Sequence, residues 1–404
     1  MKILHVMPEF PYPPDNGCRA DIWGRLQAMS HLGHGIDALV MSTKRVPGER
    51  DAAEVRRFLN SLRFVDRRPM RQCLATLAPT SVACNKPLAE VPLRGQYDIT
   101  IAEGDSLFPI FENPGLQTAV RALRVHNNES VRMWASAQTE EGFLRRQLCR
   151  FEALRFLPFS RSAYRRVDSL WFISQSEYQD FVNAQPAWAS RAVWLPPALV
   201  FGSEPKRCAA RSKQVLFVAS FHITLNREAL RWYLKKVHPC LTKDPEYGLV
   251  VVGSTNERPC AQQFTDEIKR ELRCRVHVNV EDLTPLYDEC ALFVNPMQRG
   301  AGVKLKNIHA IERRIPVVTT SVGNDGSGFI DRQHVRVADT PSDFASAITD
   351  ILNDYRTGRL MAERAHCYLT CNYACHANLV RLFTNLTPKD PWRPNDEVVS
   401  SRIA

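Results

Sequence analysis

The stretch that most constrains the fold is residues 292–328. It opens with the apolar run Leu292-Phe293-Val294, and a turn rich in glycine follows at residues 299–302. A segment of helical composition, residues 303–314, then leads to a second apolar run at residues 315–320. Strand, glycine turn, helix and strand are the parts of a βαβ crossover, so the pattern predicts a parallel sheet. The unpaired backbone N–H groups at such a helix start can bind an anion.

Basic side chains crowd this helix start. Arg299, Lys304 and Lys306 lie where the positive end of the helix dipole disfavours a cation, by roughly 0.3–1 kcal/mol each. A bound anion would offset that cost, and a diphosphate is the anion that we expect. A basic turn in contact with solvent alone is the alternative interpretation.

The length and composition predict a globular protein of two domains. The chain has 404 residues, of which 44% are hydrophobic and 24% charged, and such a chain can bury two separate cores. We expect domains at residues 1–198 and 199–385, a linker within residues 187–213, and an extended tail at residues 386–404. No run of eighteen apolar residues occurs and the first residues have the pattern of a strand. We therefore expect a cytoplasmic protein without a membrane span or a secretory signal.

The first half begins with one βαβ unit. A strand at residues 2–8 leads through a proline-rich loop and the turn Asp15-Asn16-Gly17 to a helix, and a strand follows at residues 36–41. No G-x-G-x-x-G follows the first strand, which disfavours a nicotinamide-dependent oxidoreductase.

Further strands of the first half end in polar residues at positions 103, 126 and 174. Ligands bind at the carboxyl ends of parallel strands, so we expect Glu103, residues 126–129 and Ser174 on the rim of a cleft. The second half repeats the alternation of strands and helices from residue 214 onward. The expected fold class is α/β, with two Rossmann-like doubly wound domains.

A basic, aromatic-rich segment spans residues 143–166. It holds seven arginines and one acidic residue, Glu152, among eight large apolar residues. A surface that rests on anionic lipid has this composition. A helix that buries its apolar residues and exposes its arginines explains the pattern equally well. We expect no nucleic-acid partner, because no nucleic-acid-binding motif accompanies the segment. The arginines are Arg145, Arg146, Arg150, Arg155, Arg161, Arg165 and Arg166.

The twelve cysteines show no paired zinc or disulfide spacing. Cys367, Cys371 and Cys375 recur every four residues, which places them on one stripe of a helix. With His366 and His376 beside them a metal site is conceivable. We favour small buried apolar residues in a reducing cytosol, and expect neither a metal nor a cofactor.

Several segments resemble family-four glycosyltransferases of the GT-B fold. Residues 3–8 and 10–17 resemble the opening of those enzymes, and residues 217–221 followed by Asn226 are similar to the start of their donor domain. The most specific match joins residues 282–296, the glycine turn with its lysines, and residues 315–320. The resemblance covers nearly the whole chain. It implies two Rossmann-like domains that face each other across a cleft, the second holding a nucleotide-diphosphate sugar and the first holding the acceptor.

The resemblance also implies roles for single residues. Arg299 and Lys304 would neutralise the diphosphate, and the Asn16-Gly17 turn would approach the donor closely. His126 would lie near the reacting sugar, where it could polarise a hydroxyl or support the leaving group; a buried structural histidine is the alternative. The implied catalytic residues are His126, Lys304 and Arg299, and the implied donor-binding residues are Asn16, Gly17, Ser220, Asn226, Gly300, Gly302, Val303 and His309.

Two positions depart from the family pattern. Members commonly carry a glutamate on the helix after the glycine turn, which binds the nucleotide ribose, and this chain has His309 there. A glutamate eight residues earlier often contacts the donor sugar, and this chain has Ala301. An imidazole can hydrogen-bond a ribose hydroxyl through a single ring nitrogen, whereas a carboxylate offers two oxygens.

We therefore expect a retaining hexosyltransferase. It would move a sugar from a nucleotide-diphosphate sugar to a glycan or lipid-linked acceptor in cell-envelope polysaccharide synthesis. The basic segment suggests peripheral contact with the anionic inner face of a membrane. Two alternatives stay open: a nucleotide-sugar 2-epimerase, which needs no acceptor, and a non-catalytic scaffold that binds nucleotide-sugars or partner enzymes.

Overall fold

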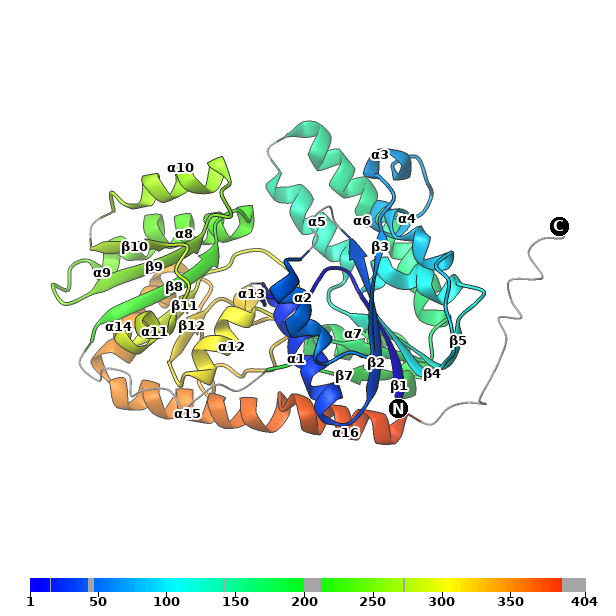
Figure 1. Cartoon of the computed structure of the whole chain (residues 1–404). Helices are drawn as coiled ribbons and strands as arrows, with labels where there is room; N and C mark the ends of the chain where they lie inside the picture. Colours follow the sequence, from blue (N-terminus) through cyan, green and yellow to red (C-terminus); the bar gives the residue numbers. More distant parts are fainter. Residues whose placement is uncertain (15, 43–46, 141, 200–211, 272, 387–404) are drawn as a thin grey trace. The chain divides into compact units, whose positions relative to one another are not determined.

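In the computed structural model the described residues are 1–14, 16–42, 47–140, 142–199, 212–271 and 273–386. They fall into two compact units, residues 1–199 with 373–386 and residues 212–372. Each unit is an α/β domain built on its own sheet (Figure 1). Among the helices in these ranges, none combines the length and the apolar character needed to cross a membrane.

A seven-stranded parallel sheet forms the centre of the first unit. Its strand order is β3-β2-β1-β4-β5-β6-β7. β1 lies inside the sheet, where Ile3 pairs with Ile36 of β2 on one side and with Ile99 of β4 on the other. The strands are β1 (Lys2–Met7), β2 (Gly35–Ser42), β3 (Ser61–Asp66), β4 (Gln96–Glu103), β5 (Gln117–Val125), β6 (Ser169–Phe172) and β7 (Ala192–Trp194).

Helices cover both faces of this sheet. Alternate residues of a strand point to opposite faces, so β1 contributes Ile3 to one core with Trp23 of α1 and contributes Leu4 to another core with Phe108 of η2. The helices are α1 (Gly17–His31), α2 (Glu49–Arg56), α3 (Met70–Cys73), α4 (Thr80–Cys84), α5 (Glu129–Thr139), α6 (Phe143–Arg165), α7 (Gln175–Ala184) and α16 (Cys375–Asn385), with the 3₁₀ helices η1 (Lys86–Ala89), η2 (Asp105–Glu112) and η3 (Pro186–Arg191).

The second unit has a six-stranded parallel sheet in the order β10-β9-β8-β11-β12-β13. Its core joins Phe217 and Val251 of the sheet to Tyr233, Phe264 and Phe344 of the helices. The strands are β8 (Gln214–Ser220), β9 (Gly248–Ser254), β10 (Cys274–Val278), β11 (Leu292–Asn295), β12 (Val317–Thr319) and β13 (Arg336–Val337). The helices are α8 (Thr224–Lys236), α9 (His238–Leu241), α10 (Pro259–Ile268), α11 (Thr284–Glu289), α12 (Leu305–Glu312), α13 (Ser321–Asn324), α14 (Pro341–Asn353) and α15 (Tyr355–Asn372).

Both sheets share one topology. Within each unit the first six strands are arranged third, second, first, fourth, fifth, sixth. In doubly wound sheets of this order, ligands bind outside the carboxyl ends of the strands at the point where the order reverses. That point lies at the ends of β1 and β4 in the first unit and of β8 and β11 in the second. The expected α/β class with two Rossmann-like domains is confirmed.

The last helix, α16, belongs to the first unit, whereas the expected domain division placed it in the second. Leu379 and Leu382 of α16 are buried in the core that contains Ile3 and Trp171, so the second unit ends near residue 372 and not at 385. The expected linker at 187–213 also starts too early, because η3 and β7 continue the first unit to residue 199. Residues 200–211 of that linker and residues 387–404 of the expected tail lie outside the described residues.

Candidate functional site

The turn between β11 and α12 depends on its glycines. Gly300 has a φ of 137° and Gly302 a φ of 73°, a region that other residues rarely adopt. A Cβ on Gly300 would lie 3.1 Å from Cε of Met297 and 3.7 Å from Cε of Lys304. The turn is therefore packed closely on its own neighbours. Gly302 and Val303 follow directly before α12, so both predicted backbone donors lie at the start of this helix.

Lys304 immediately precedes α12 and folds back over the turn. Its Nζ donates to the backbone oxygen of Ala301 at 3.3 Å and also to that of Gly302. Only 9% of Lys304 is exposed, so its charge is held beside the positive end of the α12 dipole. Arg299, the other predicted phosphate ligand, is exposed.

Lys306 connects the basic turn to the end of β8. Its Nζ donates to Oδ1 of Asn226 at 3.0 Å. Nδ2 of Asn226 donates in turn to the backbone oxygen of Ser220, also at 3.0 Å. Ser220 ends β8 and Asn226 lies in the first turn of α8. The structure thus brings two predicted donor residues, Ser220 and Asn226, to the turn through a lysine that the sequence identified only as part of a charge cluster.

The side chain of Lys306 is half-buried against the sheet. Its Nζ lies 5.5 Å from the ring centroid of Phe217, which is fully buried. Burial, and then repulsion by Lys304, lowers the pKa of Lys306 to about 7. An anion bound at the turn would favour the charged form and raise this pKa again. Lys306 can therefore gain a proton when an anionic ligand binds.

Buried amides fix the start of α12. Nδ2 of Asn295 donates to Oδ1 of Asn307, and Nδ2 of Asn307 donates to the backbone oxygen of Gly323, both at 2.9 Å. The backbone N–H of Gly323 donates to Oγ1 of Thr320 at 2.9 Å. These bonds tie α12 to β11 and to the segment after β12, and they hold the basic turn between them.

His309 lies in the second turn of α12. Its side chain is 44% exposed, and its Nδ1 is 3.6 Å from Oε2 of Glu312. The carboxylate of Glu312 is therefore close enough to orient this imidazole.

In the first unit, Asn16 and Gly17 begin α1. Oδ1 of Asn16 accepts a hydrogen bond from the backbone N–H of Arg19 at 3.0 Å, and Asn16 thereby caps the helix. Gly17 is the first residue of α1. Asp15, which completes the predicted turn, lies outside the described residues.

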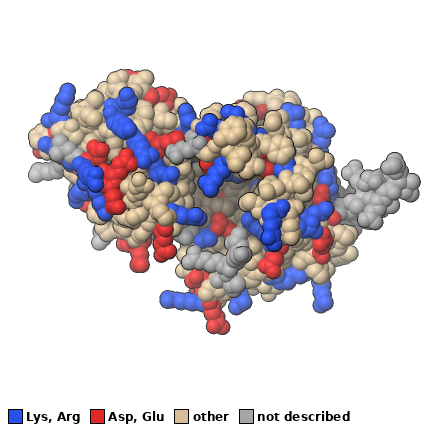
Figure 2. Space-filling view, turned by 90° about the horizontal axis from the view of Figure 1, so that it is seen from above, with Lys and Arg blue, Asp and Glu red and all other residues tan. Residues whose placement is uncertain are grey.

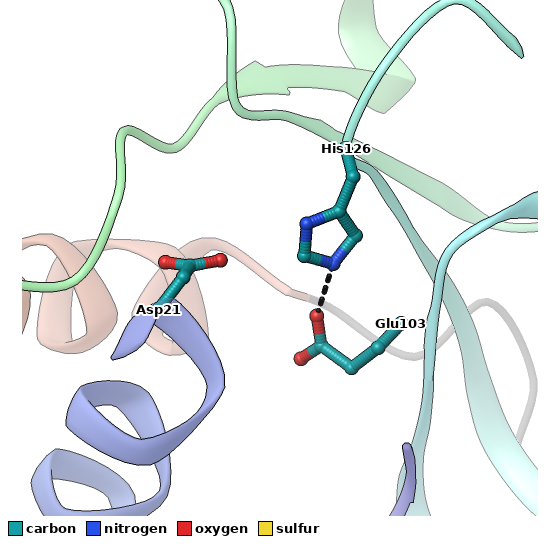
Figure 3. A group of neighbouring side chains, drawn as sticks. All are labelled: Asp21, Glu103 and His126. Carbon is teal, nitrogen blue, oxygen red and sulfur yellow. Dashed lines mark hydrogen bonds and ion pairs between the residues drawn. The ribbon is translucent and has the colours of Figure 1, made fainter. Parts of the chain in front are cut away.

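His126 meets the carboxylate of Glu103 at the carboxyl edge of the first sheet (Figure 3). Glu103 ends β4 and His126 follows the neighbouring strand β5. Nε2 of His126 lies 2.8 Å from Oε2 of Glu103, and Nε2 of His5 lies 2.7 Å from Oε1. The side chains of Glu103 and His5 are fully buried, whereas that of His126 is 14% exposed.

Two arginines neutralise this region. Arg25 donates to both oxygens of Glu103 at 3.0 Å and to Oδ2 of Asp21 at 2.8 Å. Oδ2 of Asp21 also accepts from Arg124 of β5 at 3.1 Å. Two carboxylates therefore face two guanidiniums in the interior, an arrangement in which loss of one partner typically costs about 3–5 kcal/mol.

The carboxylates of this group stay ionised. Burial acts to raise the pKa of Glu103, but the Arg25 guanidinium and the hydrogen bonds from His126 and His5 outweigh it and hold this pKa well below its usual range. Burial likewise acts to raise the pKa of Asp21, yet Arg124 and Arg25 lower it to about 2.

Asp21, Glu103 and His126 also form a geometric candidate for a metal site. Within the described ranges, one ligand atom from each lies within 4.8 Å of the other two. The guanidiniums of Arg25 and Arg124 already occupy the carboxylate oxygens. A divalent cation would be repelled by these charges, which disfavours metal binding here.

Sequence reasoning missed His5, Asp21 and Arg25. His5 interrupts an otherwise apolar strand that is buried on both faces, and a buried imidazole requires a polar partner. Asp21 and Arg25 lie four residues apart on one helix, a spacing that favours ion pairs. Both signals are present in the sequence.

Two residues expected on the rim of a cleft have structural roles instead. Ser174 is fully buried, and its Oγ caps α7 by accepting from the backbone N–H of Glu177 at 3.2 Å. Asn128 caps α5 in the same way, with Oδ1 3.2 Å from the N–H of Val131. The expectation is wrong for Ser174, because a polar residue after a strand can serve the next helix start instead of a ligand.

The basic, aromatic-rich segment forms α6, and its exposed face is largely apolar. Arg155 is buried and bonds to Glu152 and Thr80, whereas six large apolar residues are 47–77% exposed. The alternative of a helix that buries its apolar residues and exposes its arginines fits only in part, because most of the arginines are exposed but these apolar residues are exposed as well. In Figure 2, which looks down on the side where α5 and α6 lie in Figure 1, Lys and Arg side chains and some Asp and Glu side chains stand among uncharged surface. The six residues are Phe143, Leu144, Leu148, Phe151, Leu154 and Leu157.

The cysteine stripe does not form on one helix. α15 ends at Asn372 and Cys375 begins α16. Cys367 and Cys371 are exposed, so the expectation that they are buried is wrong for these two. No group of possible metal ligands in the described part of the chain includes these cysteines.

The comparisons with known proteins agree with this architecture. Residues 212–354, in the second unit, match the family model "Glycosyl transferases group 1". An "Uncharacterized 44.6 kDa protein in cps region" of Klebsiella pneumoniae is 28% identical over 387 residues, which cover 92% of this chain and 96% of that protein.

Solved structures share the fold along nearly the whole chain. A mutant of S. aureus TarM, in complex with fondaparinux, α-GlcNAc-glycerol and UDP, has a TM-score of 0.68 at 10% identity, and the match covers 95% of this chain and 99% of the TarM chain. Sucrose-phosphate synthase from Thermosynechococcus elongatus has a TM-score of 0.68 at 14% identity, with 96% and 99% covered. Anabaena HepE, in complex with UDP and glucose, has a TM-score of 0.62 at 12% identity, with 96% and 100% covered. The group 1 domain in the second unit and the fold shared along the chain bear out the resemblance to family-four-like glycosyltransferases of the GT-B fold.

Proposed function

We propose that this glycosyltransferase moves a hexose, with retention of configuration, from a nucleotide-diphosphate sugar to a glycan or lipid-linked acceptor in cell-envelope polysaccharide synthesis. The relative from a cps region supports the role in polysaccharide synthesis. The TarM and HepE complexes with UDP support a nucleotide-diphosphate donor. The family resemblance supports the hexose and the retention.

The basic turn of the second unit is the observation that carries the proposal. Glycosyl transfer breaks the bond between the anomeric carbon and a diphosphate oxygen, so negative charge grows on the leaving diphosphate. Lys304 and Lys306 lie at the start of α12, at the switch point of the sheet, and Lys306, whose pKa is lowered to about 7, can gain a proton when an anion binds. Such a site stabilises the leaving group more than it stabilises the intact donor, which is what catalysis requires.

The remaining predicted residues take supporting roles in this proposal. Arg299, exposed at the turn, would close on the diphosphate, and His309 would bond the nucleotide ribose. Asn16 and Gly17 at the start of α1 would contact the donor sugar. His126 would meet a hydroxyl of the reacting sugar, because it is the most exposed member of its buried group.

The proposal is tested by donor turnover. Nucleoside diphosphate release from a panel of nucleotide-sugars is measured for wild type, Lys304→Met and Lys306→Met, with the exposed Lys236→Met on α8 as the matched control. We expect each turn variant to lose at least tenfold in kcat/KM, or about 1.4 kcal/mol, and the control to be unchanged. Wild-type turnover in both turn variants would refute the phosphate role. Product analysis with donor alone would reveal an epimerase.

We further propose that α6 rests on an anionic membrane. Phe151 and Leu154 lie on its exposed apolar face, and Arg150 and Arg161 are exposed near them. Glu152, the single acidic residue of α6, instead accepts hydrogen bonds from Thr80. Apolar side chains beside unneutralised arginines favour anionic lipid over another protein.

Neighbouring segments extend this apolar face. The backbone oxygen of Leu77 accepts from Nε of Arg155 at 3.4 Å, which places the loop between α3 and α4 against α6. The Leu77 side chain is 99% exposed. On α5, which packs along α6, Trp134 is also exposed. We propose that this surface places the enzyme on the inner face of the membrane, near a lipid-linked acceptor.

Vesicle sedimentation tests the membrane contact. The double variant Phe151→Ser/Leu154→Ser should lose binding to vesicles that contain anionic lipid, and Arg150→Glu/Arg161→Glu should lose it as well. The matched control is Leu360→Ser, because Leu360 of α15, in the second unit, is similarly exposed. Undiminished sedimentation of both double variants would overturn the contact. An equal loss of vesicle binding in the control would show that any exposed apolar residue promotes vesicle binding, and would also overturn the role of α6.

A further inference from the structure

Two imidazoles share the carboxylate of Glu103. Nε2 of His5 bonds to Oε1 and Nε2 of His126 bonds to Oε2. Because Arg25 and the two imidazoles hold the pKa of Glu103 well below its usual range against burial, this carboxylate only accepts hydrogen bonds. Each Nε2 must therefore carry a proton and donate it.

The second ring nitrogen distinguishes the two histidines. Nδ1 of His5 is buried and has no hydrogen-bond partner among the described residues. A proton there would be a buried, unpaired donor, so the geometry places the proton of His5 on Nε2. His126 has the same bond to Glu103, but its Nδ1 lies on the side of the ring turned away from that carboxylate (Figure 3), and its side chain keeps some exposure.

The surrounding charges leave Nδ1 of His126 available. Asp21 lies within 4.8 Å of the Glu103–His126 pair. Its oxygens, however, accept from Arg25, from Arg124 and from the backbone N–H of Ala198. Asp21 is thus engaged by other donors.

We propose that Glu103 is a positioning residue that selects the Nε2–H tautomer of His126, so that Nδ1 is presented to a sugar hydroxyl as a hydrogen-bond acceptor. The inference rests on the proposed function, in which His126 meets the reacting sugar. Arg25 supports the arrangement by gripping both oxygens of Glu103. Glu103, which does not itself touch the substrate, thus determines that Nδ1 of His126 is the atom that accepts the hydrogen bond.

Nitrogen-15 NMR of the histidine-labelled enzyme tests the tautomer without any substrate. The His126 signals are assigned by their absence in His126→Gln. At a pH where the ring is neutral, we expect Nε2 to carry the proton in wild type. In Glu103→Gln the amide N–H can donate to Nε2, so the proton should move, in part or wholly, to Nδ1. A wild-type ring protonated on Nδ1, or an unchanged tautomer in Glu103→Gln, would overturn the inference.

Kinetics supply the second readout. Glu103→Gln should lower kcat at least tenfold while the donor KM stays within about twofold, and Glu103→Asp, which keeps the charge, should recover at least threefold of that loss. His5→Gln is the matched control, since it removes the other imidazole from the same carboxylate; its kcat should stay within about threefold of wild type. Equal losses in His5→Gln and Glu103→Gln would assign Glu103 a merely structural role.

The two proposals fail in distinguishable ways. Full turnover in His126→Gln would remove His126 from the proposed function, while the NMR tautomer would still test Glu103. If Glu103→Gln does not fold, the wild-type tautomer and the Glu103→Asp kinetics decide the matter.

Discussion

Binding of a nucleoside diphosphate should be accompanied by proton uptake at Lys306. Because the pKa of Lys306 is lowered to about 7, Lys306 is charged in about one tenth of the molecules at pH 8. A diphosphate within about 4–6 Å favours the charged form and raises the pKa of Lys306 back toward that of a free lysine side chain. Nearly all of Lys306 is then charged, so the complex should take up about 0.9 proton per nucleotide bound at pH 8.

Isothermal titration calorimetry measures this uptake. UDP is titrated at pH 8, where the diphosphate itself is fully ionised, into protein in two buffers that differ in ionisation enthalpy. The dependence of the observed enthalpy on the buffer gives the number of protons. Lys306→Met should reduce that number to near zero, whereas Lys236→Met on the exposed face of α8 should leave it unchanged. Binding of UDP with no proton uptake in wild type, or with equal uptake in Lys306→Met, would refute the reasoning.

Three further predictions concern the turn and the buried charges. Gly302→Ala places a Cβ at a φ of 73°, so it should lower the free energy of unfolding by about 1–2 kcal/mol and raise the donor KM at least fivefold. The control is Gly33→Ala, at a φ of 78° with open space around it. It should lose similar stability in urea unfolding with no change in KM. Asp105 is buried against hydroxyls of α6, and burial raises its pKa from 3.8 to about 7. The folded state keeps this proton longer than the unfolded state, so stability is full below about pH 4 and falls up to about pH 7. Asp105→Asn should remove that fall, so the free energy of unfolding of the variant relative to wild type should be about 2–4 kcal/mol higher at pH 8 than at pH 4. An unchanged pH dependence in urea unfolding would contradict this prediction. Asp21→Asn leaves two buried guanidiniums underpaired and should lower the free energy of unfolding by about 3–5 kcal/mol. The control Glu54→Gln, in an exposed pair, should lower it by less than about 0.5 kcal/mol. Equal losses would show that the buried network is not strongly coupled.

The alternation of strands and helices and the position of the basic turn could be predicted from the sequence. Runs such as residues 292–295 are apolar on both faces, which is the pattern of a parallel strand, and positive-φ glycines mark the turn that follows. Glu103 and His126 could be placed together because neighbouring parallel strands end at one edge.

Side-chain burial could not be predicted in the same way. Asp21, Arg25 and Lys306 lie in helices, where charged residues normally face water, and only the tertiary packing turns them inward. Leu154 and Phe151 have the composition of a core stripe, yet Ala153 and Phe156 of the same helix fill that place. The helical period alone does not say which apolar stripe meets the core.

The membership of α16 also depended on packing. Its sequence continues the helical pattern of α15 through residue 382, and the break at residues 373–374 is short. Leu379 and Leu382 are buried with Trp171 of the first sheet. A linear reading of the chain assigns this helix to the domain that precedes it, because nothing local encodes the return to the first unit.

The most direct test of the central claim compares melting temperatures with UDP and with uridine. If the basic turn grips a diphosphate, UDP at about one hundred times its Kd should stabilise the wild-type enzyme by about 2.7 kcal/mol, uridine should have little effect, and a Lys304→Met/Lys306→Met variant should lose the response. If no nucleoside diphosphate raises the melting temperature at millimolar concentration, or if the double variant responds like wild type, the claim that this turn holds the donor is wrong.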